Sequence, residues 1–274
     1  MNNGLGLLEK RNGVAAPVEY VAPPAQAPDV SDCIFYHYID LPGVGEVGRC
    51  WDLRPTIDAY LGRLDYRGKR ALDVGTASGY LTFALEARGA RVVSFDIEPV
   101  TAFDLVPYAL PQFDPGRLLH DHARGALKVR NAYWLTHRLL RSSARVYYGD
   151  IYDLPAGLGA FDVVVLGMVL PHLRDPFRAL CSACRLSRDH VVVTQQALGG
   201  DEPFAYFMPN VRKDPGNLET YHGWWVYSEV LLRRMLEVLG FTVVSSERVK
   251  HRCADPTRQE PMFEECLTLV ARRA

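Results

Sequence analysis

The 274-residue chain lacks a charge excess of either sign, since its formal net charge is −1 at pH 7 and its isoelectric point is near 6.7. A protein that binds the phosphate backbone of nucleic acids usually carries a marked excess of basic residues. The near-neutral charge of this chain therefore favours a small or neutral ligand over a nucleic acid. A local basic patch is still possible, because basic residues cluster at two places in the sequence. The first cluster is Arg67, Lys69 and Arg70, and the second is Arg248, Lys250 and Arg252.

Long apolar runs and a dense cysteine pattern are also absent. No stretch of about 18 apolar residues is present to span a bilayer, and no N-terminal segment joins a basic region to an apolar run of signal-peptide length. The six cysteines are scattered, which is not the pattern of a disulfide framework. We therefore expect no membrane partner and a reducing, cytoplasmic location.

No motif in the sequence completes a metal site. Cys181 and Cys184 have the spacing of half a zinc or redox site but fall within an expected helix, with no second pair. The segment His120-Asp121-His122 has no third ligand at motif spacing, and we interpret it as a solvated turn. No metal cofactor is expected.

The turn after the apolar run 70–74 also lacks the glycine spacing G-x-G-x-x-G of a dinucleotide site. In its place, an apolar run containing Asp73 is followed by Gly75, Thr76 and Gly79, with the spacing G-x-x-x-G. A carboxylate beside this turn would repel a pyrophosphate but favour the ammonium and ribose of a cationic ligand. A second apolar run ends in Asp96, which places another acid at the tip of the next strand to bind ribose hydroxyls. Together these residues predict a site for S-adenosylmethionine.

On these residues the chain resembles class I S-adenosylmethionine-dependent methyltransferases, from about Trp51 onward. Residues 146–155 have the form of the third motif of that family and residues 161–176 that of the fourth. With the segment 51–55 upstream and Gly223-Trp224-Trp225 before a late helix, the chain is similar to one branch in particular. That branch contains the bacterial transferases that build 5-oxyacetate on tRNA wobble uridine and their small-molecule relatives, some of which use a carboxylated cofactor.

The resemblance implies roles for the residues after the later strands. Asp150 is expected to contact the adenine amino group, with Asp153 as the competing acid, and Ile97 and Ile151 are expected to enclose the purine. His172 follows the fourth strand, where the transferred methyl should face its acceptor, so it is a candidate general base. The alternative is that His172 only fixes the turn between Pro171 and Pro176.

Further residues are candidates for the two ends of the ligand. The planar guanidinium of Arg54 is suited to binding the methionine carboxylate of the cofactor. The alternative is that Arg54 only forms an ion pair on the surface. Large aromatic and cap residues are candidates for binding the acceptor, with packing as the alternative. They are Tyr36, His37, Trp134, Tyr206, Trp224 and Trp225.

The order of patterns predicts an α/β fold: a Rossmann-like, doubly wound, seven-stranded and mostly parallel sheet that ends in an antiparallel hairpin. Residues 1–50 are expected to form an N-terminal extension and cap, and 51–274 the methyltransferase domain. Two insertions, 99–144 and 198–227, are expected to be mainly helical and rich in aromatic residues, respectively. The expected strands are 70–74, 91–95, 145–148, 161–167, 189–195, 242–249 and 263–270, and the expected helices are 56–64, 78–88, 175–186 and 228–239.

The function expected is methyl transfer from S-adenosylmethionine, by in-line displacement, to an oxygen or nitrogen of a small polar metabolite, with S-adenosylhomocysteine as product. One alternative is a tRNA-modifying (carboxy)methyltransferase, which the basic clusters favour and the near-neutral charge opposes. Another, of a different class, is a protein that binds adenosyl ligands without turnover. The oligomeric state is left open.

Overall fold

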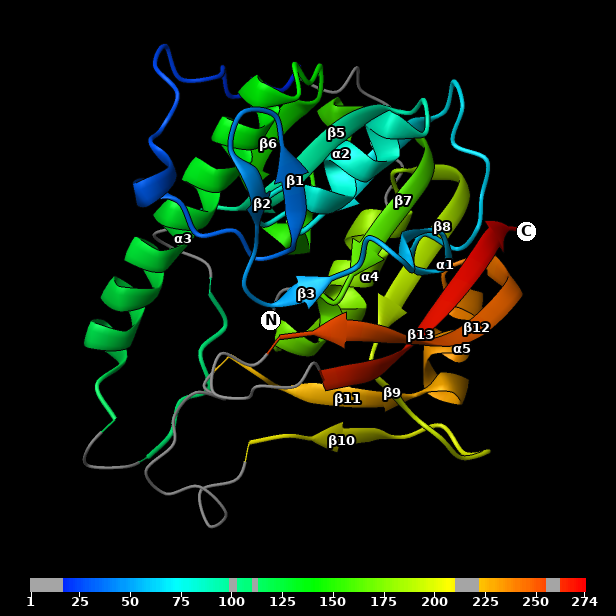
Figure 1. Ribbon diagram of the computed structural model, residues 1–274. Helices are drawn as coiled ribbons and strands as arrows, with labels where there is room; N and C mark the ends of the chain where they lie inside the picture. The colour runs from blue at the N-terminus through cyan, green and yellow to red at the C-terminus, as the bar shows by residue number, and fades with distance from the viewer. Residues whose placement is uncertain (1–16, 99–102, 110–112, 210–221, 255–261) are drawn as a thin grey trace.

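The computed structural model describes residues 17–98, 103–109, 113–209, 222–254 and 262–274. Its centre is an eight-stranded sheet with the strand order β3-β12-β13-β8-β7-β4-β5-β6. Helices cover both faces of this sheet (Figure 1). The α/β class and the mostly parallel sheet agree with the prediction.

Five parallel strands form the half of the sheet that carries the glycine turn, and their bounds lie within two residues of those predicted. The chain runs outward from β4 through β5 to β6 and then returns to the other side of β4 as β7. Ligands of open α/β sheets bind where the strand order reverses in this way, at the carboxyl ends of the strands. The strands are β4 (Arg70–Val74), β5 (Arg91–Ile97), β6 (Arg145–Gly149), β7 (Phe161–Gly167) and β8 (Ser187–Gln195).

The C-terminal hairpin is longer than predicted. Strands β12 (Phe241–Cys253) and β13 (Met262–Arg273) pair antiparallel, and β13 also pairs antiparallel with β8. The two-residue strand β3 (Trp51–Asp52) then pairs with the far end of β12 and becomes an eighth strand beyond the expected seven. Two residues give no periodicity in the sequence, so only the pairing with Arg252 and Cys253 reveals this strand.

Each face of the sheet has its own apolar core. Helix α2 (Tyr80–Ala87) and the short α1 (Ile57–Tyr60) pack on one face, with Leu81 and Leu85 against Val163 and Val165. Helices α4 (Pro176–Cys184) and α5 (Glu229–Val238) pack on the other face. Both of these helices begin at a side-chain cap, because Asp175 and Ser228 accept hydrogen bonds from backbone N–H groups of the first turn.

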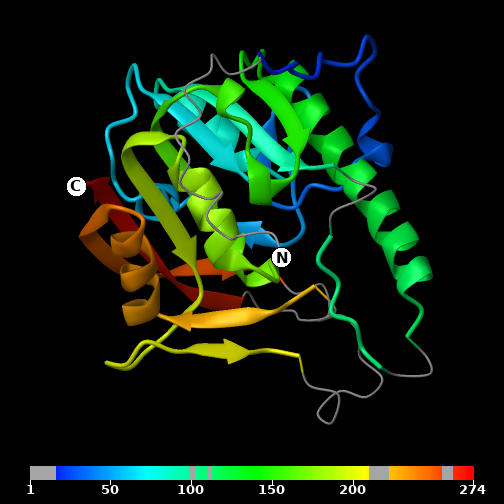
Figure 2. The same cartoon turned by 180° about the vertical axis from the view of Figure 1, so that it is seen from behind.

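The insertion after β5 contains one long helix, α3 (Pro115–Leu139), as the sequence predicted. Asp114 caps its N-terminus, and a proline follows at the first helical position. Only the last turns are buried, with Tyr133 and Trp134 packed against Phe83 and Val146. The first half runs past the end of the sheet toward the side of β10 and β11 (Figure 2).

The segment before β3 packs on α3 and forms a hairpin of β1 (Ile39–Leu41) and β2 (Gly45–Val47). A single 3-10 turn, η1 (Val30–Asp32), precedes it, and Phe35 and Leu41 pack against residues of α3. The aromatic insertion forms a second small sheet in the order β10-β11-β9. Its strands are β9 (Ala197–Leu198), β10 (Ala205–Phe207) and β11 (Trp225–Ser228).

Candidate active site

A cavity of about 590 Å³ opens at the carboxyl ends of the parallel strands. Its lining comes from the turn after β4, from the ends of β5, β6 and β7, from one face of α3, and from the segment before β3. Small-molecule sites typically have volumes of about 300–1,000 Å³. The cavity is therefore large enough for a nucleoside-sized ligand with a compact second substrate.

The glycine turn after β4 forms one wall of the cavity. Gly75 adopts φ +80°, and a Cβ there would lie 2.3 Å from a methyl carbon of Val169. A side chain at Gly75 is thus excluded both by the backbone conformation and by its neighbour. Gly79 also needs a positive φ, of +91°, but its close neighbours are the rings of Phe83 and Tyr133, so it starts helix α2 rather than lining the cavity.

Asp96 lies at the end of β5, as the sequence predicted, and it lines the cavity. One carboxylate oxygen accepts a hydrogen bond from the backbone N–H of Ala77 at 2.7 Å, and the other accepts one from the N–H of Ile97 at 2.7 Å. A carboxylate has about four lone-pair positions, so each oxygen can accept one further hydrogen bond. Burial raises the pKa of Asp96, whereas the two backbone N–H donors lower it.

His172 lies in the turn η4 (Leu170–His172) after β7 and lines the cavity. Its Nδ1 is 3.1 Å from the backbone carbonyl oxygen of His222. A carbonyl oxygen can only accept, so Nδ1 carries the hydrogen and Nε2 of the neutral ring has the free lone pair. Burial lowers the pKa of His172, which keeps the ring neutral near pH 7.

Two cap residues, Tyr36 and His37, line the opposite side of the cavity. Tyr36 is joined to the glycine turn, because its backbone N–H donates to the hydroxyl of Ser78 at 3.1 Å. His37 is 8% exposed and stacks on Tyr80 with ring centroids 5.6 Å apart. Burial alone lowers the pKa of His37 to about 4, so this side of the cavity is lined by a neutral ring.

The comparison with known families decides what class of site this is. A family model described as a methyltransferase domain matches residues 52–246. The chain belongs to this methyltransferase family. No curated protein matches the sequence.

Solved structures resemble this methyltransferase at low sequence identity. The Synechocystis PCC 6803 magnesium protoporphyrin IX methyltransferase, solved with bound S-adenosylhomocysteine, has a TM-score of 0.50 and 16% identity over 81% of this chain and 82% of its own. A Pyrococcus horikoshii protein proposed to be an RNA methyltransferase gives 0.49 and 15% over 80% and 85%. The Burkholderia thailandensis 1,6-didemethyltoxoflavin-N1-methyltransferase gives 0.46 and 18% over 81% and 78%. The first of these supports the methyltransferase fold, and the narrower resemblance to tRNA wobble-uridine transferases stays a prediction.

Two predicted cofactor residues of the methyltransferase lie beneath the turn rather than in the cavity. Asp73 is fully buried, and one carboxylate oxygen accepts a hydrogen bond from the Thr82 hydroxyl at 2.7 Å. Thr76 contacts the same hydroxyl at 2.9 Å. Burial raises the pKa of Asp73 to about 6. Neither side chain lines the cavity, so any effect of Asp73 on a ligand acts through its charge and through the shape of the turn.

The residues expected around the adenine are divided between two cavities. Ile97 and Ile151 line the main cavity. Asp150 lines a neighbouring cavity of about 600 Å³ instead, and its side chain accepts a hydrogen bond from the backbone N–H of Tyr152 at 2.8 Å. The competing acid, Asp153, lies 3.4 Å from Arg185. Phe103 and Asp104 line both cavities and so form the wall between them.

Arg54 does not line the cavity, and three carboxylates surround its guanidinium. Its nitrogens lie 2.8 Å from oxygens of Asp40, Glu46 and Asp52. The first two acids belong to the β1–β2 hairpin, and Asp52 belongs to β3. Within the described structure, Arg54 therefore holds the hairpin to the edge of the main sheet.

The four predicted large aromatics also lie outside the cavity lining. Trp134 is packed in the core between α3 and α2, and Tyr206 is 55% exposed on β10. The indole N–H of Trp224 donates to the backbone carbonyl of Asp104 at 2.7 Å, and that of Trp225 donates to the carbonyl of Arg174 at 3.2 Å. Trp224 thus holds the segment that separates the two cavities.

Helix α3 contributes cavity residues that the sequence analysis missed. The segment His120-Asp121-His122 is helical rather than a solvated turn, and His122 lines the cavity. Arg130 lies two turns further along, with its guanidinium 3.6 Å above the Tyr148 ring, and its buried Nη2 has no hydrogen-bond partner among the described residues. The signal was present as helical spacing, because residues 122, 126 and 130 recur every four positions on one face.

A second missed residue, Tyr60, comes from α1. A methyl group built at Gly167, the last residue of β7, would lie 3.1 Å from the Tyr60 hydroxyl oxygen. Both residues line the cavity, and the absence of a side chain at Gly167 leaves room for that hydroxyl. A tyrosine within a short helix gives no local signal that it will face a strand more than 100 residues later.

Within the described ranges, no three histidine, cysteine or acidic side chains are arranged to hold a metal ion. Cys181 and Cys184 lie in α4 as predicted, and the Cys184 side chain is buried in the core. Across the same ranges, no helix combines the length and apolar character that a membrane span requires.

Proposed function

We propose that this methyltransferase transfers a methyl group from S-adenosylmethionine to an oxygen or nitrogen nucleophile of a small molecule. The observation that carries the proposal is the position of Asp96, which lines the cavity with Gly75 and whose carboxylate is fixed by two backbone N–H groups that leave two of its lone pairs unused. A strand-end carboxylate next to a glycine turn is how doubly wound folds bind ribose hydroxyls.

The rest of the lining fits an adenosyl ligand. Ile97 and Ile151 supply apolar surface for a purine, and Gly75 leaves the backbone accessible. The Asp73 carboxylate lies beneath the turn, where its negative charge would favour a sulfonium over a phosphate. When it is bound, S-adenosylmethionine supplies a methyl group that its sulfonium activates for in-line displacement.

His172 is the residue that we assign to the acceptor's proton. Its Nδ1–H is held by the carbonyl of His222, so Nε2 is oriented as the basic atom. A neutral imidazole in this position can take the proton as the acceptor attacks, an effect typically worth about 10²- to 10⁴-fold in rate. Because methyl transfer also depends on alignment, the cavity walls contribute by holding the two reactants together.

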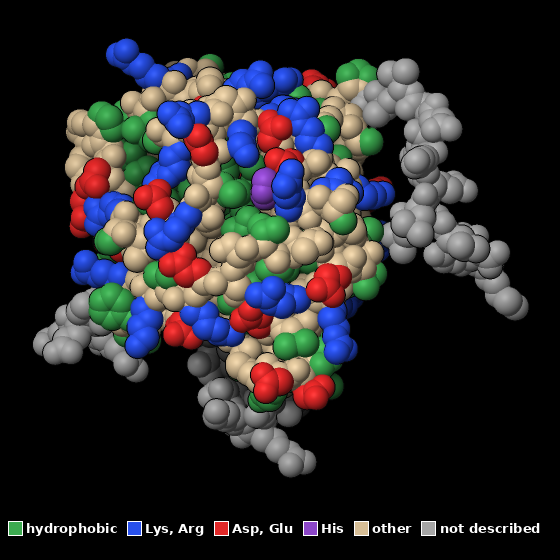
Figure 3. Space-filling model, turned by 90° about the vertical axis from the view of Figure 1, so that its right-hand side faces the viewer, with side chains coloured by type: hydrophobic (Ala, Val, Ile, Leu, Met, Phe, Trp, Pro, Cys, Tyr) green, Lys and Arg blue, Asp and Glu red, His purple; other side chains and the backbone are tan. Residues whose placement is uncertain are grey.

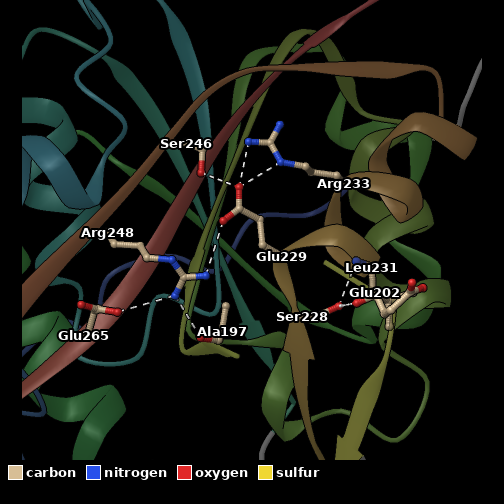
Figure 4. Close-up of polar contacts among 9 residues, drawn as sticks. All are labelled: Ala197, Glu202, Ser228, Glu229, Leu231, Arg233, Ser246, Arg248 and Glu265. Atoms are coloured by element: carbon tan, nitrogen blue, oxygen red, sulfur yellow. Dashed lines mark hydrogen bonds and ion pairs between the residues drawn. The ribbon is translucent and has the colours of Figure 1, made fainter. Parts of the chain in front are cut away.

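The charged surface supports a small acceptor over a nucleic acid. In the predicted basic cluster, Arg248 lies 3.4 Å from Glu229 and 3.6 Å from Glu265, as Figure 4 shows for its polar contacts. Arg252 lies 3.7 Å from Asp52. In the space-filling view, side chains of both signs are interspersed on the face drawn (Figure 3). Cations that are already paired release fewer counterions on binding phosphates.

Calorimetry and label transfer test the proposal together. We expect the purified chain to bind S-adenosylmethionine and S-adenosylhomocysteine but not NADH, and to move labelled methyl into the low-molecular-weight fraction of a cell extract. Binding to bulk tRNA in a gel shift should be negligible at physiological salt. Failure to bind either adenosyl ligand overturns the cofactor assignment.

The tRNA alternative has its own signature in the same experiment. Label would appear in RNA, and affinity would fall by orders of magnitude between low and moderate salt. Neutralising Arg248, Lys250 and Arg252 would then flatten the salt dependence. Asp201 is an exposed residue of the loop before β10, so Asp201→Ala serves as a surface control in both assays.

A further inference from the structure

Three histidines from separate segments meet at one end of the cavity. The rings of His172 and His222 have centroids 5.2 Å apart at 34°, and those of His122 and His222 are 6.0 Å apart at 45°. Phe103 meets His122 edge to face at 3.9 Å. All four line the cavity, so this end, called the histidine end below, is walled by planar rings.

The histidine end carries little uncompensated charge among the described residues. Burial lowers the pKa of His122 and His172 and lowers that of His222 to about 4, and the three rings also repel one another's charge. Of the nearby acids, Asp104 bonds to Tyr152 and lies 3.5 Å from Arg174, and Asp121 lies 3.8 Å from Arg117. Burying a charged acceptor here would cost several kcal/mol without a partner.

Among the described residues, the one lysine or arginine in the cavity lining is Arg130. Arg130 is eight residues from His122 on α3, which at 1.5 Å per residue separates their backbones by about 12 Å. Its guanidinium lies over Tyr148, the residue paired with Asp96 across β5 and β6. Arg130 therefore faces the proposed nucleoside position rather than the histidine end.

We propose that the histidine end binds a planar aromatic acceptor that is uncharged before reaction and offers an acidic hydroxyl or ring N–H as the nucleophile. This inference rests on the proposed function, because it names the acceptor class of the same site. Planar rings stack on aromatic walls with a gain of about 0.5–1.5 kcal/mol per pair beyond the area that they bury.

The acceptor's hydroxyl or N–H must be acidic because the proposed base, His172, is a weak one. A buried imidazole is a weak base, and a phenol-type hydroxyl, with a pKa of about 10, yields its proton far more readily than an aliphatic alcohol. In the transfer, the acceptor oxygen or nitrogen donates an electron pair to the methyl carbon. The electron pair of the broken C–S bond stays on sulfur, which becomes a neutral thioether. The acceptor's proton passes to Nε2 of His172 and then to solvent.

Binding of three matched probes to the full chain tests this class. Naphthol is planar and neutral, decahydronaphthol has the same skeleton without planarity, and naphthoate is planar but anionic. By calorimetry with S-adenosylhomocysteine present, we expect naphthol to bind at least about tenfold more tightly than either of the others. Equal or tighter binding of decahydronaphthol or naphthoate, or no naphthol binding at about 1 mM, overturns the proposal.

Substitutions in α3 test whether the aromatic side chain of His122, rather than the integrity of the helix, binds naphthol. His122→Ala should weaken naphthol about fivefold or more, whereas His122→Phe, which keeps a planar ring, should restore most of the affinity. His120→Ala is the matched control, since His120 is exposed on the same helix and lies outside the lining. A His122→Ala protein that binds naphthol like the wild type also overturns the proposal.

The affinity for S-adenosylhomocysteine is also measured by calorimetry without naphthol. This measurement distinguishes a failure of the cofactor assignment from a failure of the proposed acceptor class. If the adenosyl ligand binds and naphthol shows no preference, the cofactor assignment stands and the acceptor class fails. If naphthol is preferred in the absence of any adenosyl binding, the planar site stands and the cofactor assignment fails.

Discussion

One oxygen of Asp96 accepts a hydrogen bond at 2.7 Å from the backbone N–H of Ala77, nineteen residues earlier in the chain. Ala77 has φ +49°, which is unusual for a residue with a side chain. The bond therefore fixes a strained turn between two neighbouring strands and sets the orientation of the carboxylate at the same time. Asp96 has a structural role in the turn and a proposed role toward the ligand.

The two roles of Asp96 predict a specific ordering of variants. Asp96→Ala removes the acceptor for Ala77 and for the ribose, so we expect adenosylhomocysteine affinity to fall by about 10- to 100-fold, the loss of 1.5–3 kcal/mol for hydrogen bonds to a charged acceptor. Asp96→Asn keeps one acceptor oxygen but turns an N–H group toward a backbone donor, so it should lose nearly as much. Unchanged affinity in both variants, measured by calorimetry, would remove Asp96 from the site.

The sequence was informative about strand ends because a parallel sheet brings them to one edge. Asp96, Ile97 and His172 each follow an apolar run, and each lines the cavity. Asp73 also lies in such a run, but strand side chains alternate between faces and the turn closes above it, so its partner is Thr82. Periodicity gives the position of a residue along a strand but not what covers it.

Arg54 and α3 show the other limit of sequence reasoning. Two of the acids around Arg54 lie on the β1–β2 hairpin, and no local pattern indicates that this hairpin would fold back to it. The spacing predicted that α3 is a helix, but the direction in which its first half leaves the sheet depends on tertiary packing. The histidine end was missed for this reason.

Replacing Arg54 tests whether it holds the hairpin or binds ligand. Asp52 is nearly buried, and Arg54→Ala would leave its carboxylate with the backbone N–H of residue 54, at 3.3 Å, and Arg252, at 3.7 Å, as partners among the described residues. We expect a loss of about 1–3 kcal/mol in the free energy of unfolding by urea, with adenosylhomocysteine affinity changed less than about threefold. The exposed pair of Arg63 and Glu247 is the control, and Arg63→Ala should cost less than about 1 kcal/mol. A large loss of affinity would restore Arg54 as a ligand-binding residue.

The base assignment predicts a pH profile for turnover. Burial lowers the pKa of His172, so more than half of the rings are neutral at the ordinary histidine pKa of 6.5. The rate should therefore rise with pH to a plateau, with a midpoint below pH 6.5. His172→Asn keeps an N–H donor for the carbonyl of His222 but has no basic nitrogen, and it should lower kcat about 100-fold with cofactor affinity retained. A decrease below about threefold would leave His172 as a turn residue.

Asp73→Asn tests the buried acid beneath the turn. The folded-state pKa of Asp73 is raised from 3.8 to about 6, so its contribution to stability is present at low pH and is lost as the pH rises through 6. At pH 8 the asparagine variant, which cannot ionise, should be more stable than the wild type by about 2–3 kcal/mol in urea unfolding. If the charge favours a sulfonium, the same variant should bind S-adenosylmethionine less tightly while binding neutral S-adenosylhomocysteine almost as before. Equal unfolding free energies of the variant and the wild type at pH 8 would mean that the ionised Asp73 does not destabilise the folded protein.

His37 predicts the opposite dependence of stability on pH. The ring is 8% exposed, and its Nδ1 has no hydrogen-bond partner among the described residues, so a proton taken up there would be buried without compensation. Burial lowers the folded-state pKa to about 4, against 6.5 in the unfolded chain. The unfolded chain therefore binds the proton first, and stability is full above pH 6.5 and falls as the pH drops toward 4.

The expected size of this effect is about 1.4 kcal/mol per pH unit between the two pKa values, or about 2 kcal/mol at pH 5. Other buried histidines, such as His251, shift in the same direction, so the wild type alone does not isolate His37. His37→Phe keeps a planar ring to stack on Tyr80 and cannot take up a proton. Between pH 7 and pH 5, its urea unfolding free energy should fall by about 2 kcal/mol less than that of the wild type. Parallel losses in the two proteins would show that the His37 ring does not resist protonation in the folded state.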